Sequence, residues 1–295
     1  MATSKPLTPP RSSAGSTPEP QQHHHHKQHT THHHPSHASS SAPSPLSLQT
    51  LQSLLLTPFT LSLPLTSPLW TLIEHVYSFP PSHPRRPPGP RVRDPSKPMQ
   101  VLCVGLPRTG TESLQQALLH LGYDHTYHGW DIVYDPSGLS YAPGWVALAR
   151  KKFLSNSQPN ITTQDFDQLL GHCTAVTDAA ASVFASEIIA AYPDAKVILN
   201  SRGDMQTQGG GGAWQRSLEN TLVKANDSWA FWIASWLDRE CFWAWHVYER
   251  FLWPGLFRCG LDGYGGFADA VRRGHGAGIA RGELLTPFDG LEVTW

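Results

Sequence analysis

The stretch best suited to chemistry is GLPRTGTESL, residues 105–114, which follows a short apolar run. Gly105 and Gly110 have the spacing of the two glycines in a phosphate-binding loop, G-x-x-x-x-G-K-[S/T]. Thr111 stands where that loop carries its lysine, and Glu112 stands where it carries the hydroxyl that binds magnesium. Because a carboxylate without the lysine would repel a triphosphate, the sequence disfavours ATP hydrolysis and phosphoryl transfer.

The remaining features of this loop suit an anion that needs no metal. Backbone N–H groups at the start of a helix form an anion-binding turn, and the helix dipole adds positive charge there. Arg108 is the cation of the loop and could neutralise charge that develops on a bridging oxygen during group transfer. The alternative is a Pro-Arg turn with a solvated arginine and no ligand. The predicted anion-binding residues are Pro107, Arg108, Thr109, Gly110, Thr111 and Glu112.

The elements around the loop have the pattern of an α/β domain with a parallel sheet, beginning at Met99. Residues 101–105 are predicted to form a buried strand. Residues 111–122 are predicted to form the helix that follows, with Gly122 as its C-terminal cap.

The same order recurs further along the chain. A second strand is predicted to end at Asp178, followed by a helix to about residue 191, and residues 195–201 form another buried strand just before Arg202. In open α/β sheets the carboxyl ends of the strands border the ligand crevice. We therefore expect Asp178 and Arg202 to converge with the loop on one rim.

The C-terminal part is predicted to contain one long helix, residues 226–252, capped by Asn226, Asp227 or Ser228, and a last strand at residues 282–288. Four tryptophans recur near one face of that helix. They are expected to face the core, with the wall of an acceptor pocket as the alternative. These residues are Trp229, Trp232, Trp236 and Trp243.

Composition limits the classes of function. Residues 1–98 are rich in proline and serine and contain a histidine tract at 23–37, so we predict that they are disordered. The formal net charge of −1 gives no positive electrostatic field that would attract nucleic acid. The four cysteines lack C-x-x-C spacing, which favours a reducing compartment over a disulfide framework or a zinc site.

No stable membrane span is predicted either. The apolar stretch 51–70 is interrupted by Pro58, Pro64 and Pro68, and no signal peptide precedes it. The expectation is a cytoplasmic protein, with membrane association left open and no oligomeric state predicted.

Four segments together carry a resemblance to a known family: VLCVGLPRTGTESLQQAL (101–118), YHGWDI (127–132), the stretch 175–202 and WQRSLENTL (214–222). They resemble sulfotransferases of the P-loop type, in particular a fungal and eukaryotic branch. The resemblance spans roughly residues 92–295. It implies a P-loop-type three-layer sandwich with a central parallel sheet over 99–295. It also implies that the domain lacks the family's closing helix, because the chain stops at Trp295.

The resemblance implies that the loop binds the 5′-phosphosulfate of 3′-phosphoadenosine 5′-phosphosulfate as co-substrate, without a metal. Arg108 then takes the place of the P-loop lysine. Arg202 and Ser217 match the family's arginine and serine that hold the 3′-phosphate, a pairing suited to a dianion. The connection between them is longer here, because residues 207–212 insert a glycine-rich segment.

The predicted reaction is in-line transfer of a sulfuryl group to a hydroxyl or amine of a small-molecule acceptor. His128 is the preferred general base because imidazole titrates near neutral pH, Asp178 is the second candidate, and Asp131 ranks below both. The alternatives are that His128 is a half-buried loop histidine and that Asp178 caps the following helix. Tyr127 and Trp130 are expected to join the tryptophans in an apolar acceptor pocket.

Two other functions compete with this one. A non-catalytic nucleotide-binding P-loop module would keep the loop without a usable acceptor site. An atypical nucleotide kinase would need ATP and magnesium, and the threonine at position 111 disfavours it.

Overall fold

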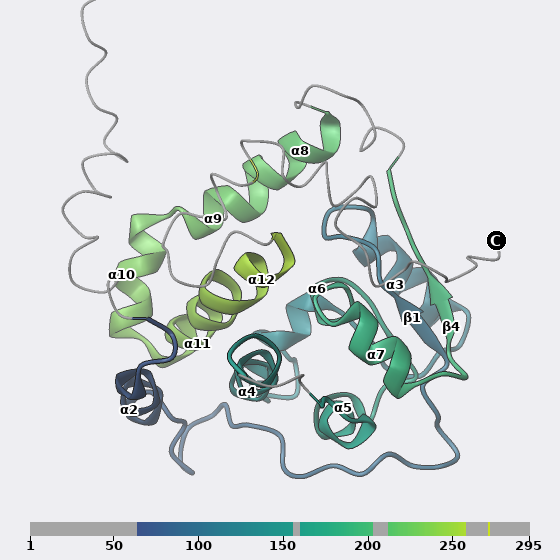
Figure 1. Cartoon of the computed structure of the whole chain (residues 1–295), viewed down its shortest axis with the longest axis horizontal. Coiled ribbons are helices and arrows are strands. Elements are labelled where there is room, and N and C mark those ends of the chain that lie inside the picture. The colour runs from purple at the N-terminus through teal and green to yellow at the C-terminus, as the bar shows by residue number, and fades with distance from the viewer. Residues whose placement is uncertain (1–63, 156–159, 203–211, 258–270, 272–295) are drawn as a thin grey trace, which may run out of the picture. The chain divides into compact units, whose positions relative to one another are not determined.

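The computed structural model describes residues 64–155, 160–202, 212–257 and 271 (Figure 1). Its sheet has four parallel strands in the order β2-β3-β1-β4. Val101 of β1 pairs with Ala175 of β3 on one side and with Lys196 of β4 on the other. This confirms the predicted α/β class with a parallel sheet. The strands are β1 (Val101–Cys103), β2 (Thr126–Tyr127), β3 (Ala175–Val176) and β4 (Lys196–Ile198).

The two faces of the sheet pack against different helices, which gives the three layers. Alternate residues of a strand point to opposite faces. Val101 and Cys103 pack with Leu118 of α3 (Thr111–His120), whereas Leu102 joins the main hydrophobic core on the other side. That main core includes buried residues of α4 (Ala142–Phe153), α5 (Thr163–Leu170), α6 (Ala179–Ser182) and α7 (Ala185–Ala191).

Helix α3 ends as its sequence predicts. Gly122 has a φ of 90°, and the N–H of Tyr123 donates to the carbonyl of Leu118 at 3.1 Å. This is the left-handed glycine cap that closes many helices.

The stretch after β3 forms two helices, α6 and α7, where one was predicted. The backbone leaves helical geometry at Phe184, which has φ −112° and ψ 27° and whose ring is fully buried. This ring belongs to the main core.

The predicted cap at Ser228 is confirmed, but the single helix predicted over 226–252 is wrong, because the chain turns at Asp238. Ser228 caps α10 (Trp229–Leu237), and its hydroxyl accepts from the N–H of Phe231 at 3.3 Å. Asp238 has extended backbone angles and accepts from the N–H of Cys241 at 2.8 Å, which starts α11 (Arg239–Val247). An aspartate that caps a helix this way interrupts an otherwise continuous helical pattern.

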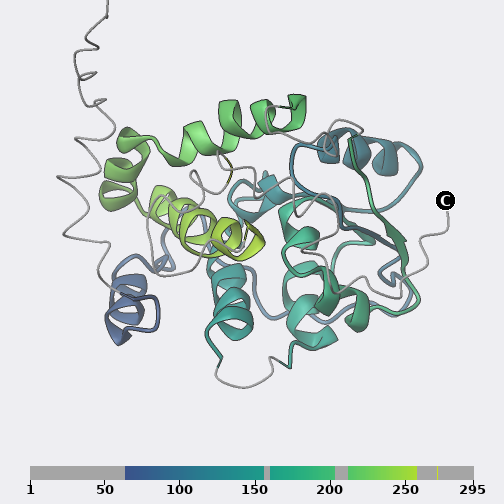
Figure 2. The ribbon, with the colours of Figure 1, turned by 45° about the horizontal axis from the view of Figure 1, so that its top comes forward.

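The other helices of this part precede and follow that pair in the chain, and Figure 2 shows them in green and yellow. They are α8 (Ala213–Leu218), the π-helical turn η3 (Glu219–Val223), α9 (Lys224–Asn226), the π-helical turn η4 (Tyr248–Leu252) and α12 (Trp253–Phe257).

The four tryptophans of this region do not share one environment. Trp243 is buried, whereas Trp229 is 50% exposed. The expectation of a uniform core-facing stripe is therefore wrong, since the break at Asp238 changes the direction of the chain between them.

Order begins before Met99, because α2 spans Pro68–Val76. Ser67 caps this helix, Trp70 is buried in the main core, and the hydroxyl of Tyr77 donates to the carbonyl of Trp236 at 2.7 Å. Residues 64–98 thus differ from the predicted disorder, since contacts to the C-terminal helices compensate for the proline-rich composition. Residues 1–63 and the predicted last strand at 282–288 lie outside the described residues.

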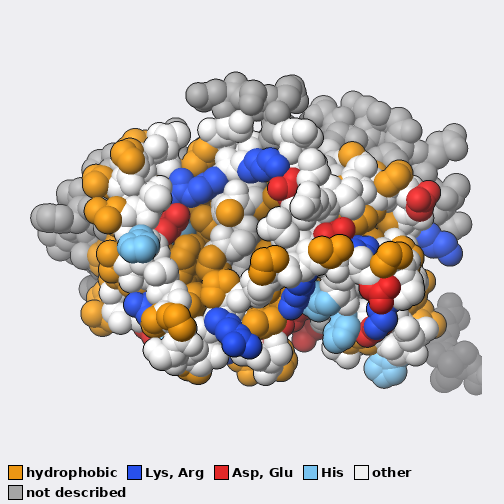
Figure 3. Space-filling view, turned by 90° about the horizontal axis from the view of Figure 1, so that it is seen from below, with side chains coloured by type: hydrophobic (Ala, Val, Ile, Leu, Met, Phe, Trp, Pro, Cys, Tyr) orange, Lys and Arg blue, Asp and Glu red, His pale blue; other side chains and the backbone are white. Residues whose placement is uncertain are grey.

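Charged side chains are mixed on the face seen in Figure 3, where lysines and arginines lie beside aspartates and glutamates. Within the described ranges, none of the helices is both long and apolar enough to cross a bilayer.

Candidate functional site

The loop between β1 and α3 is held close to the end of β4. A Cβ atom on Gly105 would lie 2.2 Å from the carbonyl oxygen of Asn200, so only glycine fits there. Thr109 braces the loop from within: its hydroxyl donates to the carbonyl of Leu106 at 2.6 Å and accepts from the amide of Asn200. Thr109 is therefore the one predicted loop residue that does not line the cavity described below.

The turn presents the start of α3 without a side-chain cap. Arg108 and Gly110 have positive φ angles of 67° and 91°, and Gly110 occupies the capping position with no side-chain hydrogen bond to the helix. The first N–H groups of α3 are thus left for an anion, as in other helix-terminal anion sites.

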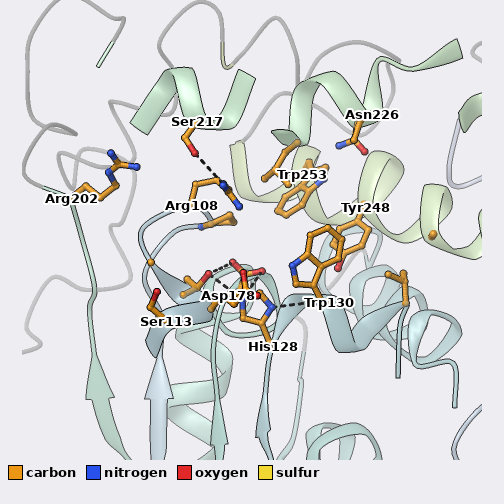
Figure 4. A pocket seen from close by; sticks show the side chains of 18 of the residues that line it. Arg108, Ser113, His128, Trp130, Asp178, Arg202, Ser217, Asn226, Tyr248 and Trp253 are labelled. Carbon is orange, nitrogen blue, oxygen red and sulfur yellow. Dashed lines mark hydrogen bonds and ion pairs between the residues drawn. The ribbon is translucent and has the colours of Figure 1, made fainter. Parts of the chain in front are cut away.

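Helix α8 is bound to this turn by two hydrogen bonds. The Nε of Arg108 donates to the hydroxyl of Ser217 at 3.1 Å. The indole of Trp214 donates to the carbonyl of Pro107 at 3.0 Å. The structure thus brings together Arg108 and Ser217, which are far apart in the sequence, and Figure 4 shows Arg202 on the far side of Arg108 from Trp130.

A cavity of about 390 Å³ opens above the loop, in the size range of small-molecule sites. All predicted site residues except Thr109 line it. They are Pro107, Arg108, Gly110, Thr111, Glu112, His128, Asp178, Arg202 and Ser217.

Three polar side chains are connected at the floor of the cavity (Figure 4). The hydroxyl of Thr111 donates to Oδ1 of Asp178 at 3.0 Å, and Nε2 of His128 lies 3.2 Å from the same hydroxyl. Nε2 of His128 is also 4.0 Å from Oδ2 of Asp178. The three come from α3, from the segment after β2 and from the end of β3, which meet at the carboxyl edge of the sheet.

The hydrogen bonds of His128 determine which of its ring nitrogens carries the proton. Its Nδ1 accepts from the N–H of Trp130 at 3.2 Å, so the ring proton lies on Nε2, facing Thr111. Asp131 holds the backbone in place, because its Oδ2 accepts from the N–H of His128 at 2.7 Å. Burial is the main cause that raises the pKa of Asp131. Asp131 therefore acts as a turn cap in this geometry.

Asp178 is held in an unusual conformation. Its φ of 63° and ψ of −148° lie in a region that residues other than glycine rarely adopt, at a cost of about 1–3 kcal/mol. It occupies the capping position of α6 but makes no side-chain cap hydrogen bond there. A Cβ atom on Gly129 would lie 2.0 Å from Oδ2 of Asp178, so that glycine gives the carboxylate its room.

Sequence reasoning missed much of the cavity wall, including three aromatic side chains, Phe231, Tyr248 and Trp253. Tyr248 and Trp253 stack with ring centroids 5.1 Å apart and an angle of 18° between their planes. The hydroxyl of Tyr248 donates to the carbonyl of Gly129, and burial raises its pKa. The residues not predicted are Ser113, Val133, Leu222, Ala225, Asn226, Phe231, Ala244, Tyr248 and Trp253.

The aromatic residues that were predicted to line the cavity do so only in part. Trp130 lines it and is 55% exposed. Tyr127 is buried in the core, where its hydroxyl accepts from the indole of Trp145 at 2.9 Å. The four tryptophans of α10 and α11 are not among the lining residues. The signal that could have found the wall is the aromatic density of residues 226–257, but the break at Asp238 decides which rings face inward.

In the part of the chain that the structure describes, no group of three or more histidine, cysteine, aspartate or glutamate side chains could hold a metal ion.

Two comparisons with known proteins match this region. A family model described as "Sulfotransferase domain" matches residues 100–277. The protein named "Ava biosynthesis cluster protein M", from Aspergillus versicolor, is 38% identical over 157 residues, which cover 53% of this chain and 53% of that protein. The chain therefore spans about half the length of this curated relative. All the predicted site residues lie inside the range that the family model matches.

Proposed function

The chain belongs to the sulfotransferase domain family, and from this premise we propose that it transfers a sulfuryl group from 3′-phosphoadenosine 5′-phosphosulfate to a small-molecule acceptor. The observation that carries the proposal is the start of α3, which has no side-chain cap and opens into the cavity that Arg108 and Asp178 also line. An anion site and a carboxylate in one cavity are what group transfer from an anionic donor requires. The relative's name refers to a biosynthesis cluster, which favours a biosynthetic small molecule as acceptor.

At the donor end, the chain supplies positive charge and N–H groups. The first turn of α3 and Arg108 would bind the 5′-phosphosulfate and stabilise charge on the leaving phosphate. Ser217 holds Arg108 by the 3.1 Å hydrogen bond and, with Arg202, would bind the 3′-phosphate. A guanidinium does this without the metal that a triphosphate needs.

At the acceptor end, one group must take a proton. The acceptor oxygen forms a bond to sulfur while the bond from sulfur to the bridging oxygen breaks, and the electron pair leaves with the 3′,5′-bisphosphate. We assign the acceptor proton to the carboxylate of Asp178. His128 is less well placed to take this proton, because its Nε2 already carries a proton and its Nδ1 accepts from the N–H of Trp130.

Thermal unfolding with added nucleotide tests the donor site. Adenosine 3′,5′-bisphosphate at a hundredfold its Kd should raise the Tm by about 5 °C or more. Arg108→Ala and Arg202→Ala should abolish the shift. Arg86→Ala should keep it, because Arg86 is an exposed arginine that does not line the cavity.

Activity separates the proposal from its competitors. The wild-type protein with 3′-phosphoadenosine 5′-phosphosulfate should sulfate at least one member of a panel of phenols, alcohols and amines, detected by mass spectrometry. Stabilisation by ATP and magnesium alone would instead support a kinase. Bisphosphate binding without transfer to any acceptor would support a non-catalytic module.

A further inference from the structure

One polar group in the aromatic part of the cavity has no partner. Asn226 ends α9 and lines the cavity, yet it is only 6% exposed. Its amide nitrogen, Nδ2, finds no hydrogen-bond acceptor among the described residues. Figure 4 shows Asn226 and Arg202 at opposite sides of the cavity, with Arg108 between them.

A buried amide without a partner is unfavourable. Leaving one buried donor unsatisfied destabilises a protein by about 1–3 kcal/mol, and most buried polar groups in folded proteins are paired. The alignment of α9 is set by the hydrogen bond from the N–H of Asp227 to the carbonyl of Val223 at 2.8 Å, so the chain holds Asn226 at this position. A ligand that presents an acceptor atom would satisfy the donor.

The surfaces around Asn226 suit a flat ligand. Phe231, Tyr248 and Trp253 line the cavity with it, and the rings of Tyr248 and Trp253 are nearly parallel. Flat aromatic side chains favour offset stacking with planar, conjugated molecules. The two π-helical turns contribute here, since Leu222 belongs to η3 and Tyr248 to η4, and such turns are frequent at functional sites.

We propose that Asn226 determines acceptor specificity by donating a hydrogen bond to a carbonyl oxygen on a planar, conjugated acceptor whose nucleophilic hydroxyl lies at Asp178. This inference rests on the proposed function, because it assigns the acceptor end of the same cavity. The acceptor class is therefore a phenol that carries a carbonyl remote from the hydroxyl to be sulfated. A site with a dedicated donor rejects the analogue that lacks the matching acceptor, because the donor is then left unpaired.

Two probes of similar shape test this directly. 7-Hydroxycoumarin has a phenol at one end and a lactone carbonyl at the other, and 2-naphthol has the phenol on a similar bicyclic frame without the carbonyl. With the protein saturated with adenosine 3′,5′-bisphosphate, calorimetry should give about five- to tenfold tighter binding of 7-hydroxycoumarin, the effect of one neutral hydrogen bond.

Variants assign this difference to the amide. Asn226→Leu and the smaller Asn226→Ala should bring the two affinities within twofold of each other. Asn220→Leu is the matched control, because Asn220 lies on η3, is exposed and does not line the cavity. It should keep the full difference. The Tm shift with the bisphosphate should persist in all three variants, which shows that each is folded with its donor site intact.

The outcomes separate the two proposals. Equal affinities in the wild-type protein, no measurable binding of 7-hydroxycoumarin, or a difference that survives in Asn226→Leu would overturn the role of Asn226 while bisphosphate binding leaves the proposed function standing. No Tm shift with the bisphosphate in the wild-type protein would overturn the proposed function itself, and the inference with it.

Discussion

At the scale of single residues, Asp178 and Gly129 form one unit. Asp178 adopts backbone angles that are unfavourable for an aspartate, and its carboxylate occupies the space that a side chain at position 129 would fill. Thr111 adds a hydrogen bond of 3.0 Å to the same carboxylate. Strain that surrounding contacts maintain is frequent at functional sites. We therefore expect kcat to depend more on where this carboxylate lies than on how tightly it is packed.

Two substitutions should give the same defect by different routes. Asp178→Asn removes the base and should lower kcat by about a hundredfold or more, the usual contribution of a general base. Gly129→Ala keeps the carboxylate but displaces it, because the new methyl group would lie 2.0 Å from Oδ2, so kcat should fall similarly. The measurement is kcat with an acceptor that the wild-type protein sulfates, together with the Tm shift caused by the bisphosphate, which should persist.

The control for the glycine is Gly89→Ala. A Cβ atom there would meet nothing within 4 Å, so kcat should stay at the wild-type value. If Gly129→Ala were as active as Gly89→Ala, kcat would not depend on the position of the carboxylate next to Gly129. That result would contradict the role assigned to Asp178.

At the scale of secondary structure elements, local signals were predictable and distant contacts were not. The glycine spacing of the loop and the cap at Gly122 are encoded within a few residues, and both predictions hold in the structure. The cavity wall depends on where the C-terminal helices turn. A single capping aspartate, Asp238, divides the predicted long helix, and periodicity alone gives no sign of that break.

Helix α2 is the other element that composition did not predict, and its stability depends on contacts with residues far away in the sequence. Trp70 is 2% exposed, its ring centroid lies 5.2 Å from that of His246, and the guanidinium of Arg250 lies 4.4 Å from its centroid. The proline- and serine-rich composition around the helix predicts disorder, but these contacts come from residues more than 170 positions away. A sequence pattern cannot report a core that forms between such distant segments.

The contacts of Trp70 give a prediction for this element. Trp70→Ala should lower the free energy of unfolding by about 3–5 kcal/mol, as for other buried tryptophans that lose their whole side chain. Leu72→Ala on the same helix should change it by less than about 0.5 kcal/mol, because Leu72 is 60% exposed. Urea denaturation of both variants measures the difference. Equal effects would show that α2 is not part of the cooperative unit.

At the scale of the whole molecule, two histidines and a buried glutamate set opposite trends of stability with pH. Burial lowers the pKa of His246 to about 4, and His172 behaves in the same way. His172 accepts from Nη1 of Arg91 at 2.6 Å, and burial, followed by the charge of Arg91, lowers its pKa to about 4. The unfolded chain then binds more protons between about pH 4 and 6.5, so stability is lost as the pH falls through this window. Burial raises the pKa of Glu249 to about 8, so here the folded chain binds more protons.

The carboxyl group of Glu249 therefore lowers the free energy of unfolding as the pH rises from about 4.5 to 8. The carboxyl is 7% exposed, its Oε2 has no hydrogen-bond partner among the described residues, and Asp227 raises its pKa further while Arg250 lowers it. Glu249→Gln cannot ionise, so its free energy of unfolding should exceed that of the wild-type protein increasingly from pH 5 to pH 8. The slope of the difference should reach at most about 1.4 kcal/mol per pH unit, the limit for one proton.

Urea denaturation at half-unit steps of pH measures that slope, and His172→Gln serves as the comparison. His172→Gln should reduce but not remove the slope on the acid side, from about pH 4 to 6.5, because His246 keeps its contribution, and it should leave the loss of stability above pH 6.5 in place. Parallel curves for Glu249→Gln and the wild-type protein above pH 6.5 would show that Glu249 is already ionised in the folded chain at neutral pH. Of these groups, the two histidines lower stability as the pH falls below about 6.5, and Glu249 lowers it as the pH rises towards 8, so stability should be greatest near pH 6.5.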